Sequence, residues 1–265
     1  KGVHLRPLDT RGGGAAIASG LVTMRALWAL VRGRQSGRLA GVHVNMAERL
    51  SLVRKGLVVI FSRLLGVPVV LHLHAAQLHH QYHHLSRVLR WLLRKVFACA
   101  DVCIVLGENS RRFVIEQLQV SAENVKVVIN GVPPAMRLRR SERIGAPKQV
   151  LFLGNLMERK GVSDLLHALA TPCLAKHQWE AHFAGGGDRA HYQAYAPKSG
   201  LSSRVHFIGW ADKDAAAALL AAADILVLPS YDEGLPLVIL EALANGVAII
   251  CTPVGEISSF LKDGR

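Results

Sequence analysis

Runs of apolar and β-branched residues recur along the chain, separated by longer segments in which apolar and polar residues mix. Several runs are apolar throughout, which is typical of strands buried on both faces of a parallel sheet. The pattern predicts strands at residues 41–44, 68–72, 102–106, 126–129, 149–153, 180–184, 205–208, 225–228 and 248–251.

The segments between these runs repeat apolar positions with a helical period, as at 85–98, 110–117, 161–169 and 215–222. Alternation of strands and helices predicts an α/β architecture with parallel sheets. We interpret residues 15–31 as a further amphipathic helix that faces the core. Arg25 interrupts this stretch, and a membrane span needs about 20 predominantly apolar residues.

Regular periodicity stops at residues 133–147, which hold three prolines and the basic run RLRR, and it restarts at Val150. The charge balance changes at the same place. Residues 1–144 contain 22 Lys and Arg against 7 Asp and Glu, whereas the remainder contains 10 against 12. We therefore predict two doubly wound, Rossmann-like domains, 1–145 and 146–265, with an interdomain cleft and with ligands at the loops that follow the strands.

Composition narrows the class of protein. A chain of 265 residues with 51% hydrophobic content can bury a sizeable core, and 19% charged residues argues against disorder. The net charge of +13 comes from the first domain, which predicts a polyanionic partner there, either a membrane surface or a nucleic acid. The four cysteines form no CxxC pair, so we interpret them as buried, reduced thiols of a cytoplasmic protein.

The strongest chemical signal is PSYDEGLPLVILEALANG at residues 229–246, in which Glu233 and Glu241 stand eight residues apart. Glu233 falls in a loop at the carboxyl end of an apolar strand, and Gly234, Leu235 and Pro236 lead into a helix. The free N–H groups at a helix start suit a diphosphate. The two carboxylates can accept hydrogen bonds from sugar and ribose hydroxyls.

This segment resembles the Glu–seven–Glu signature of retaining glycosyltransferases of the GT-B fold, especially glycosyltransferase family 4. Further motifs carry the same resemblance, among them VLFLGNLMERKGVSDLLHALA at 150–170, HFAGGGDRA at 182–190, RVHFIGW at 204–210 and CTPVGEISSFLKDG at 251–264. In the first half, VVLHLHAAQ at 69–77, ADVCIVLGENSRRF at 100–113 and VVINGVP at 127–133 resemble branches that build bacterial surface polysaccharides. The resemblance covers nearly the whole chain.

The resemblance assigns roles to single positions in the second domain. Lys160 matches the lysine that binds the donor phosphates, and Glu233 and Glu241 match the glutamates near the sugar and on the ribose. The family usually has an arginine directly after Gly154, where this chain has the uncharged Asn155, and Arg159 in the same loop can supply the missing charge. The remaining donor-binding positions are in the glycine-rich loop, at the base-binding strand end and at the helix start: Gly185, Gly186, Ile208, Gly234, Leu235 and Pro236.

In the first domain, His74 matches the active-site histidine that lies near the transferred sugar in the family, and Ala75 replaces the glycine that often follows it. We expect His72 to turn to the other face of the strand end. The resemblance implies that the first strand of this acceptor-side domain is missing, and that the donor-binding domain continues beyond residue 264.

Two features of the first domain are open to a second interpretation. The pairs His79/His83 and His80/His84 have the i, i+4 spacing of metal ligands, but no HExxH pattern and no nearby acid accompany them. We predict no metal site there and interpret them as a polar, pH-sensitive face. The basic helix at 86–96 predicts contact with anionic lipid, and no zinc-finger or RNA-recognition motif supports nucleic acid.

The resemblance implies transfer of a hexose from a nucleotide diphosphate sugar, linked to UDP or GDP, to a lipid-linked saccharide acceptor. Transfer would proceed with retention, in surface polysaccharide synthesis, without a cofactor or metal. The enzyme would be cytoplasmic and peripheral on the inner face of the cell membrane. Two alternatives stay open: a sugar-nucleotide epimerase of similar fold, and a non-catalytic nucleotide-sugar-binding or membrane-associated module, which Asn155 favours.

Overall fold

The computed structural model describes residues 4–12, 16–48, 50–75, 77–134 and 145–262, with side chains from residue 19 onward in the first helix. The chain divides into two compact units, Lys1–Ile129 and Asn130–Arg265. Residues 135–144, next to the predicted domain boundary, lie outside the described residues. Each unit has its own parallel sheet and its own apolar core.

The first unit contains a four-stranded parallel sheet in the order β1-β2-β3-β4. The strands are β1 (Val42–Met46), β2 (Val69–Leu73), β3 (Val102–Val105) and β4 (Val125–Val127). The helices are α1 (Ala16–Gln35), α2 (Leu50–Leu64), α3 (Leu78–His84), α4 (Arg87–Ala98) and α5 (Glu108–Glu116). A 3₁₀ turn, η1 (Ala122–Asn124), precedes β4.

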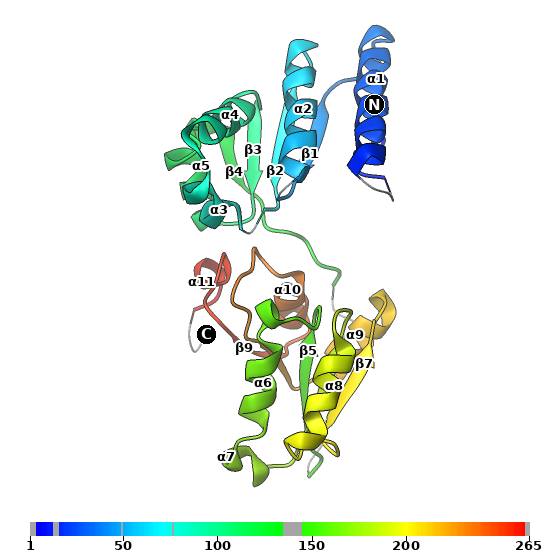
Figure 1. Cartoon of the computed structure of the whole chain (residues 1–265), viewed down its shortest axis with the longest axis vertical. Coiled ribbons are helices and arrows are strands. Elements are labelled where there is room, and N and C mark those ends of the chain that lie inside the picture. The colour runs from blue at the N-terminus through cyan, green and yellow to red at the C-terminus, as the bar shows by residue number, and fades with distance from the viewer. Residues whose placement is uncertain (1–3, 13–15, 49, 76, 135–144, 263–265) are drawn as a thin grey trace. The chain divides into compact units, whose positions relative to one another are not determined.

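Burial alternates along the strands of this sheet. In β2, for example, Val69, Leu71 and Leu73 are buried, and Val70 and His72 between them are half-buried. The buried positions join residues of α2, α4 and α5 in one core. Right-handed crossovers between successive neighbouring strands place α2, α4 and α5 on the same face of the sheet. Helix α1 packs beside α2, and α2 packs beside α4 (Figure 1).

The second unit contains a five-stranded parallel sheet in the order β7-β6-β5-β8-β9. Its strands are β5 (Lys148–Leu153), β6 (Trp179–Ala184), β7 (Val205–Gly209), β8 (Ile225–Leu228) and β9 (Ala248–Cys251). Its helices are α6 (Val162–Leu169), α7 (Pro172–Ala175), α8 (Arg189–Lys198), α9 (Lys213–Ala222), α10 (Leu237–Ala244) and α11 (Ile257–Phe260), and η2 (Glu158–Lys160) is a 3₁₀ turn.

The strand order of this sheet reverses at β5, which pairs with β6 on one side and β8 on the other. Helices α6 and α8 therefore cover one face, where they pack together, and α9 and α10 cover the other (Figure 1). The carboxyl ends of β5 and β8 meet at the point where the order reverses. In open α/β sheets this edge is the usual ligand site.

All nine predicted strands and the parallel, Rossmann-like architecture are confirmed. Two expectations are wrong in part. Helix α1 faces the core with Ala26 and Leu30, but Trp28 on its opposite side is exposed, so the helix is not polar on its outer side. Cys103 is buried, which raises the pKa of its thiol to about 12, whereas Cys173 is exposed because it sits on the short surface helix α7.

Candidate functional site

The candidate site lies at the carboxyl edge of the second sheet, where β8 ends at Leu228 and the loop 229–236 leads into α10. Leu226 and Leu228 are fully buried, which anchors the start of this loop in the core. Pro236 is the N-cap of α10 and makes no side-chain capping bond, so the helix begins at Leu237. The predicted strand, loop and helix are thus in place around Glu233.

Glu233 is buried and forms an ion pair with the ammonium of Lys160. The same carboxylate oxygen, Oε1, accepts a hydrogen bond from the hydroxyl of Ser230 over 2.7 Å. Oε2 has no hydrogen-bond partner among the residues that the structure describes. A buried carboxylate is stable when it is paired and hydrogen-bonded, and the second oxygen can still accept a bond from a ligand.

A left-handed glycine turn places Lys160 beside Glu233. Lys160 ends η2, and Gly161 follows with φ of 67° before α6 begins. A Cβ built on Gly161 would collide with the carbonyl oxygen of Pro229. Only glycine therefore permits both the left-handed backbone and the close approach of the two loops. The ERKG sequence brings its lysine to the glutamate loop through this contact.

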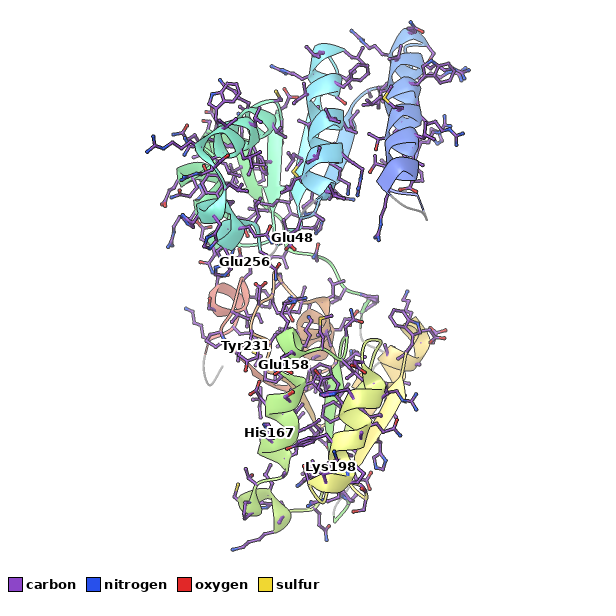
Figure 2. All side chains as sticks on the ribbon, in the orientation of Figure 1. Glu48, Glu158, His167, Lys198, Tyr231 and Glu256 are labelled. Carbon is purple, nitrogen blue, oxygen red and sulfur yellow. The ribbon has the colours of Figure 1, made fainter. Side chains whose placement is uncertain are left out.

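Arg159 is held by the glutamate loop itself. Its Nη1 donates to the carbonyl oxygen of Asp232 over 2.6 Å, and the backbone N–H of Tyr231 donates to the Arg159 carbonyl oxygen over 2.9 Å. The Tyr231 hydroxyl donates to Asp164 over 2.7 Å, and this carboxylate raises the pKa of the tyrosine. Tyr231 lies at the same end of the unit as Glu158, away from Lys198 (Figure 2). Arg159 thus fixes the loop that carries Glu233.

Three backbone segments meet where β5, β6 and β7 end, at the same carboxyl edge of the sheet. The N–H of Gly154 donates to Ala184 over 2.9 Å, and the N–H of Gly185 donates to Gly209 over 2.7 Å. A Cβ built on Gly185 would collide with the carbonyl oxygen of Gly154. The glycine-rich loop therefore has a packing role, because its glycines let the neighbouring backbone approach closely. Asn155 is exposed next to Gly186, and Ile208 and Trp210 are exposed at the end of β7.

Glu241 lies on α10, with its side chain half-buried. Its carboxylate makes no hydrogen bond or ion pair with the described residues, whereas its backbone carbonyl oxygen accepts from Asn245. Leu235 is buried, and the carbonyl oxygen of Gly234 accepts from the N–H of Glu256 over 2.9 Å. The start of α10 is therefore fixed from both sides, and Glu241 keeps a carboxylate available to a ligand.

His74 belongs to the first unit, directly after β2, and its side chain is exposed. Partial burial lowers the pKa of His74 most, and the nearby charges of Lys55 and, to a smaller extent, His43 lower this pKa further. The rings of His72 and His74 lie 4.0 Å apart, so the expectation that His72 turns to the other face is wrong. Residues two apart along a strand share a face. His72 and His74 are therefore neighbours on one side of β2.

Sequence reasoning did not identify Ser230, which holds Glu233, or Gly255, whose added Cβ would collide with the Glu233 carbonyl oxygen. The position of Ser230 directly after a buried strand and three residues before Glu233 is the signal that could have found it. In the part of the chain that the structure describes, no group of three or more His, Cys, Asp or Glu is arranged to hold a metal ion. The site therefore combines a cation, two carboxylates and a helix start, a set suited to a phosphorylated sugar.

Two family models match the chain, one to each half. Residues 1–131 match the glycosyl transferase 4-like domain, and residues 147–265 match the glycosyl transferases group 1 domain. With two Rossmann-like parallel sheets, these matches define the class of protein. Each half of the chain matches a glycosyltransferase domain, and the fold is that of the GT-B glycosyltransferases.

Individual relatives agree with this class. Over 117 residues the chain is 32% identical to the lipopolysaccharide glucosyltransferase WaaG of Escherichia coli, covering 44% of this chain and 31% of WaaG. It is 30% identical over 166 residues to the phosphatidyl-myo-inositol mannosyltransferase of Mycobacterium leprae, a match that covers 61% of this chain and 43% of that protein. The structure of Anabaena HepE in complex with UDP and glucose superposes with a TM-score of 0.68 at 19% identity, over 96% of this chain and 69% of HepE. The chain spans about half the length of the curated relatives it matches.

Proposed function

We propose that this protein transfers a hexose from a nucleotide diphosphate sugar to a hydroxyl of a lipid-linked saccharide, with retention of anomeric configuration. The observation that carries the proposal is the buried pair of Lys160 and Glu233 at the carboxyl edge of the second sheet. In this pair, the ammonium of Lys160 can bind the departing phosphates, and the adjacent carboxylate of Glu233 can bind the sugar. The second unit is the donor-binding domain on this proposal, and the first is the acceptor-side domain.

The proposed donor contacts lie around α10 and are supported by the geometry there. The unpartnered carboxylate of Glu241 accepts hydrogen bonds from the ribose hydroxyls. The N–H groups at the start of α10 and the ammonium of Lys160 hold the diphosphate, because both attract negative charge. Gly154, Gly185 and Gly186 have no side chain, so on this proposal the diphosphate can approach the backbone of the loops that they form. Ile208, at the open end of β7, lies against the base.

The chemical step is front-face departure of the nucleotide diphosphate. The bond from the anomeric carbon to the phosphate oxygen breaks, the acceptor hydroxyl oxygen bonds to the same face, and its proton passes to the departing phosphate. Lys160 stabilises the charge that grows on that phosphate. No metal is required on this proposal, because Lys160 and the α10 start share this charge. Glu233 orients the sugar through Oε2, and the family resemblance gives His74 a role near the transferred sugar.

The proposed acceptor and the proposed cellular location are supported by the relatives and by the charge of the first unit, not by the geometry around Glu233. Relatives named for lipopolysaccharide and phosphatidyl-myo-inositol act on membrane-bound glycans or lipids by those names. The first unit is strongly basic, which favours an anionic membrane surface over a neutral partner. We therefore place the protein in the cytoplasm, peripheral on the inner face of the cell membrane, in surface polysaccharide or lipopolysaccharide synthesis.

The test compares Lys160→Ala with Lys198→Ala, a control on an exposed lysine of α8 in the same unit. In assays of the full chain with a UDP- or GDP-hexose and membrane glycolipid acceptors, Lys160→Ala should slow transfer by about 100-fold or more, as the loss of a transition-state charge contact does. Lys198→Ala should keep the wild-type rate. An unchanged rate in Lys160→Ala, or donor turnover without any acceptor, would contradict the proposal, and the second result would point to an epimerase.

A further inference from the structure

Three helices of the first unit are apolar on two opposite sides. The inner side of α1 buries Ala26 and Leu30, while its outer side exposes Leu21, Met24 and Trp28. The large apolar side chain of Trp28 is 61% exposed although the helix that carries it packs against the folded unit. An ordinary surface helix has a polar outer side, because water solvates it.

Helices α2 and α4 repeat this arrangement. The outer stripe of α2 runs along its full length, through Leu50, Val53, Leu57, Ile60 and Leu64, opposite its buried residues Val58, Val59 and Ser62. On α4 the exposed residues Val88, Trp91 and Leu92 lie opposite the buried Leu93 and Phe97. Trp91 is 56% exposed.

The three stripes face the same way. Helix α1 packs against α2, and α2 packs against α4, where a Cβ built on Gly56 would touch the Val96 side chain (Figure 1). Each helix turns its buried side toward the core of the sheet, which includes Leu30, Val59 and Phe97. Their outer sides therefore form one surface, which we call the three-helix face: the exposed residues of α1, α2 and α4.

The three-helix face carries one sign of charge. The helices α1, α2 and α4 contain no Asp or Glu, and six of their ten Lys and Arg residues are exposed and so belong to this face: Arg25, Arg32, Arg34, Arg63, Arg87 and Lys95. Arg32 lies 4.7 Å from the ring centre of Trp28, and Lys95 lies 5.8 Å from that of Trp91. Arg63 on α2 pairs with Asp101, which lies outside these helices. Exposed tryptophans beside long cationic side chains are typical of surfaces that rest at the boundary of a lipid bilayer.

None of the described helices is long and apolar enough to cross a membrane.

We propose that the three-helix face lies in the surface of an anionic bilayer, with Trp28 and Trp91 inserted and the Arg and Lys heads among the phosphates. A contact with lipid headgroups through charge alone would need only the cations, so it would not explain the exposed apolar residues on the same face. A protein partner would have to be both apolar and uniformly acidic to match this face. The proposal rests on the proposed function only for its membrane acceptor, and its evidence is independent of the donor site.

The first experiment is flotation of the full chain with vesicles of phosphatidylglycerol and phosphatidylethanolamine. We expect binding that persists in about 0.5 M salt, where the screening length falls to roughly 4 Å and exposed charges contribute little. The double variant Trp28→Gln, Trp91→Gln should bind about tenfold more weakly or worse. Trp210→Gln removes an exposed tryptophan of the second unit and should bind like the wild type.

The second experiment places the tryptophans in the lipid. Vesicles with brominated acyl chains should quench the wild-type tryptophan fluorescence, and the double variant should lose this quenching, because Trp179 is buried and Trp210 lies in the second unit. The variants change exposed side chains, so their urea midpoints should match the wild type and exclude misfolding. Binding abolished by salt, or quenching that survives in the double variant, would overturn the proposal.

Two other occupants would give different results. If a second copy of the chain covers the three-helix face, the wild type should be a dimer in solution and the double variant a monomer. If another segment of the chain covers it, aqueous acrylamide should fail to quench Trp28 and Trp91 in the absence of vesicles. Either result would overturn the membrane proposal. Stabilisation by a sugar nucleotide, measured separately, would still test the proposed function.

Discussion

Glu233 shows how single residues prepare the site before any ligand arrives. Its carboxylate is buried, yet one oxygen is already committed to Lys160 and Ser230 and the other has no described partner. A fixed carboxylate loses little freedom when it accepts a bond from a sugar hydroxyl, which favours binding. Ser230 is fully buried, and its carbonyl oxygen accepts a bond from the Thr252 hydroxyl. The serine therefore links Glu233 to the residue that follows β9.

Replacing Ser230 with alanine tests this link. The change removes a 2.7 Å hydrogen bond to a buried carboxylate, and such bonds to charged groups contribute about 1.5 to 3 kcal/mol. We expect the free energy of unfolding of the second unit to fall by that amount in urea denaturation. The control, Ser203→Ala, changes an exposed serine before β7 and should lose under about 0.5 kcal/mol. Equal stability of the two variants would show that Ser230 does not hold Glu233.

His72 gives the first unit a dependence on pH. Burial, and then the charges of His74 and His43, lower the pKa of His72 to about 4, and its buried Nε2 has no hydrogen-bond partner among the residues that the structure describes. The unfolded chain takes up this proton near pH 6.5, so between pH 6.5 and 4 the unfolded state binds more protons than the folded state. The free energy of unfolding should therefore fall as the pH falls through this range.

The measurement is urea denaturation of the wild type and His72→Gln at several pH values. The glutamine variant should lose stability less steeply between pH 6.5 and 4, because it has no group to protonate there. His84→Gln, a change at an exposed histidine on α3, should keep the wild-type slope. Parallel curves for the wild type and His72→Gln would contradict the low pKa.

At the scale of elements, the site depends on glycines that let loops touch. Gly161 and Gly200 both have φ near 70°, but only Gly161 faces a backbone atom that a Cβ would strike. Gly200→Ala should therefore cost about 1 to 2 kcal/mol for the left-handed backbone alone. Gly161→Ala should cost at least twice as much in thermal or urea unfolding and should also weaken donor binding. Similar losses in both variants would show that the contact with Pro229 can relax.

The elements also show what the sequence could predict. Apolar and β-branched runs located all nine strands, although only some of the strands are buried on both faces and others, such as β1 and β9, alternate between buried and exposed positions or carry exposed residues. The sequence did not predict that α1 has apolar residues on two opposite sides, because an amphipathic helix is expected to have a single apolar stripe that faces the core. The glutamate motif located the site loop, but the Arg159 bond to Asp232 depends on side-chain direction, which no spacing encodes.

At the scale of the whole chain, the features on which the two proposals rest lie in different units. The first unit has the excess of positive charge and the three-helix face. The second has the Lys160–Glu233 pair and Glu241, whose carboxylate has no partner among the described residues. The charge division was visible in the sequence, because counting Lys, Arg, Asp and Glu needs no structure. That the apolar outer sides gather on one face required the packing of α1, α2 and α4. Asn155, where the family usually has an arginine, is exposed beside Gly186.

The most direct measurement is thermal unfolding of the full chain with UDP-, GDP- and ADP-hexoses, for the wild type, Glu241→Ala and the control Glu116→Ala. A ligand that binds only the folded state at a hundredfold excess over its Kd stabilises it by about 2.7 kcal/mol. The account predicts that one of these sugar nucleotides raises the unfolding midpoint of the wild type and of Glu116→Ala, and that Glu241→Ala loses the rise. No rise with any of them, or an equal rise in Glu241→Ala, would contradict a donor site in the second unit.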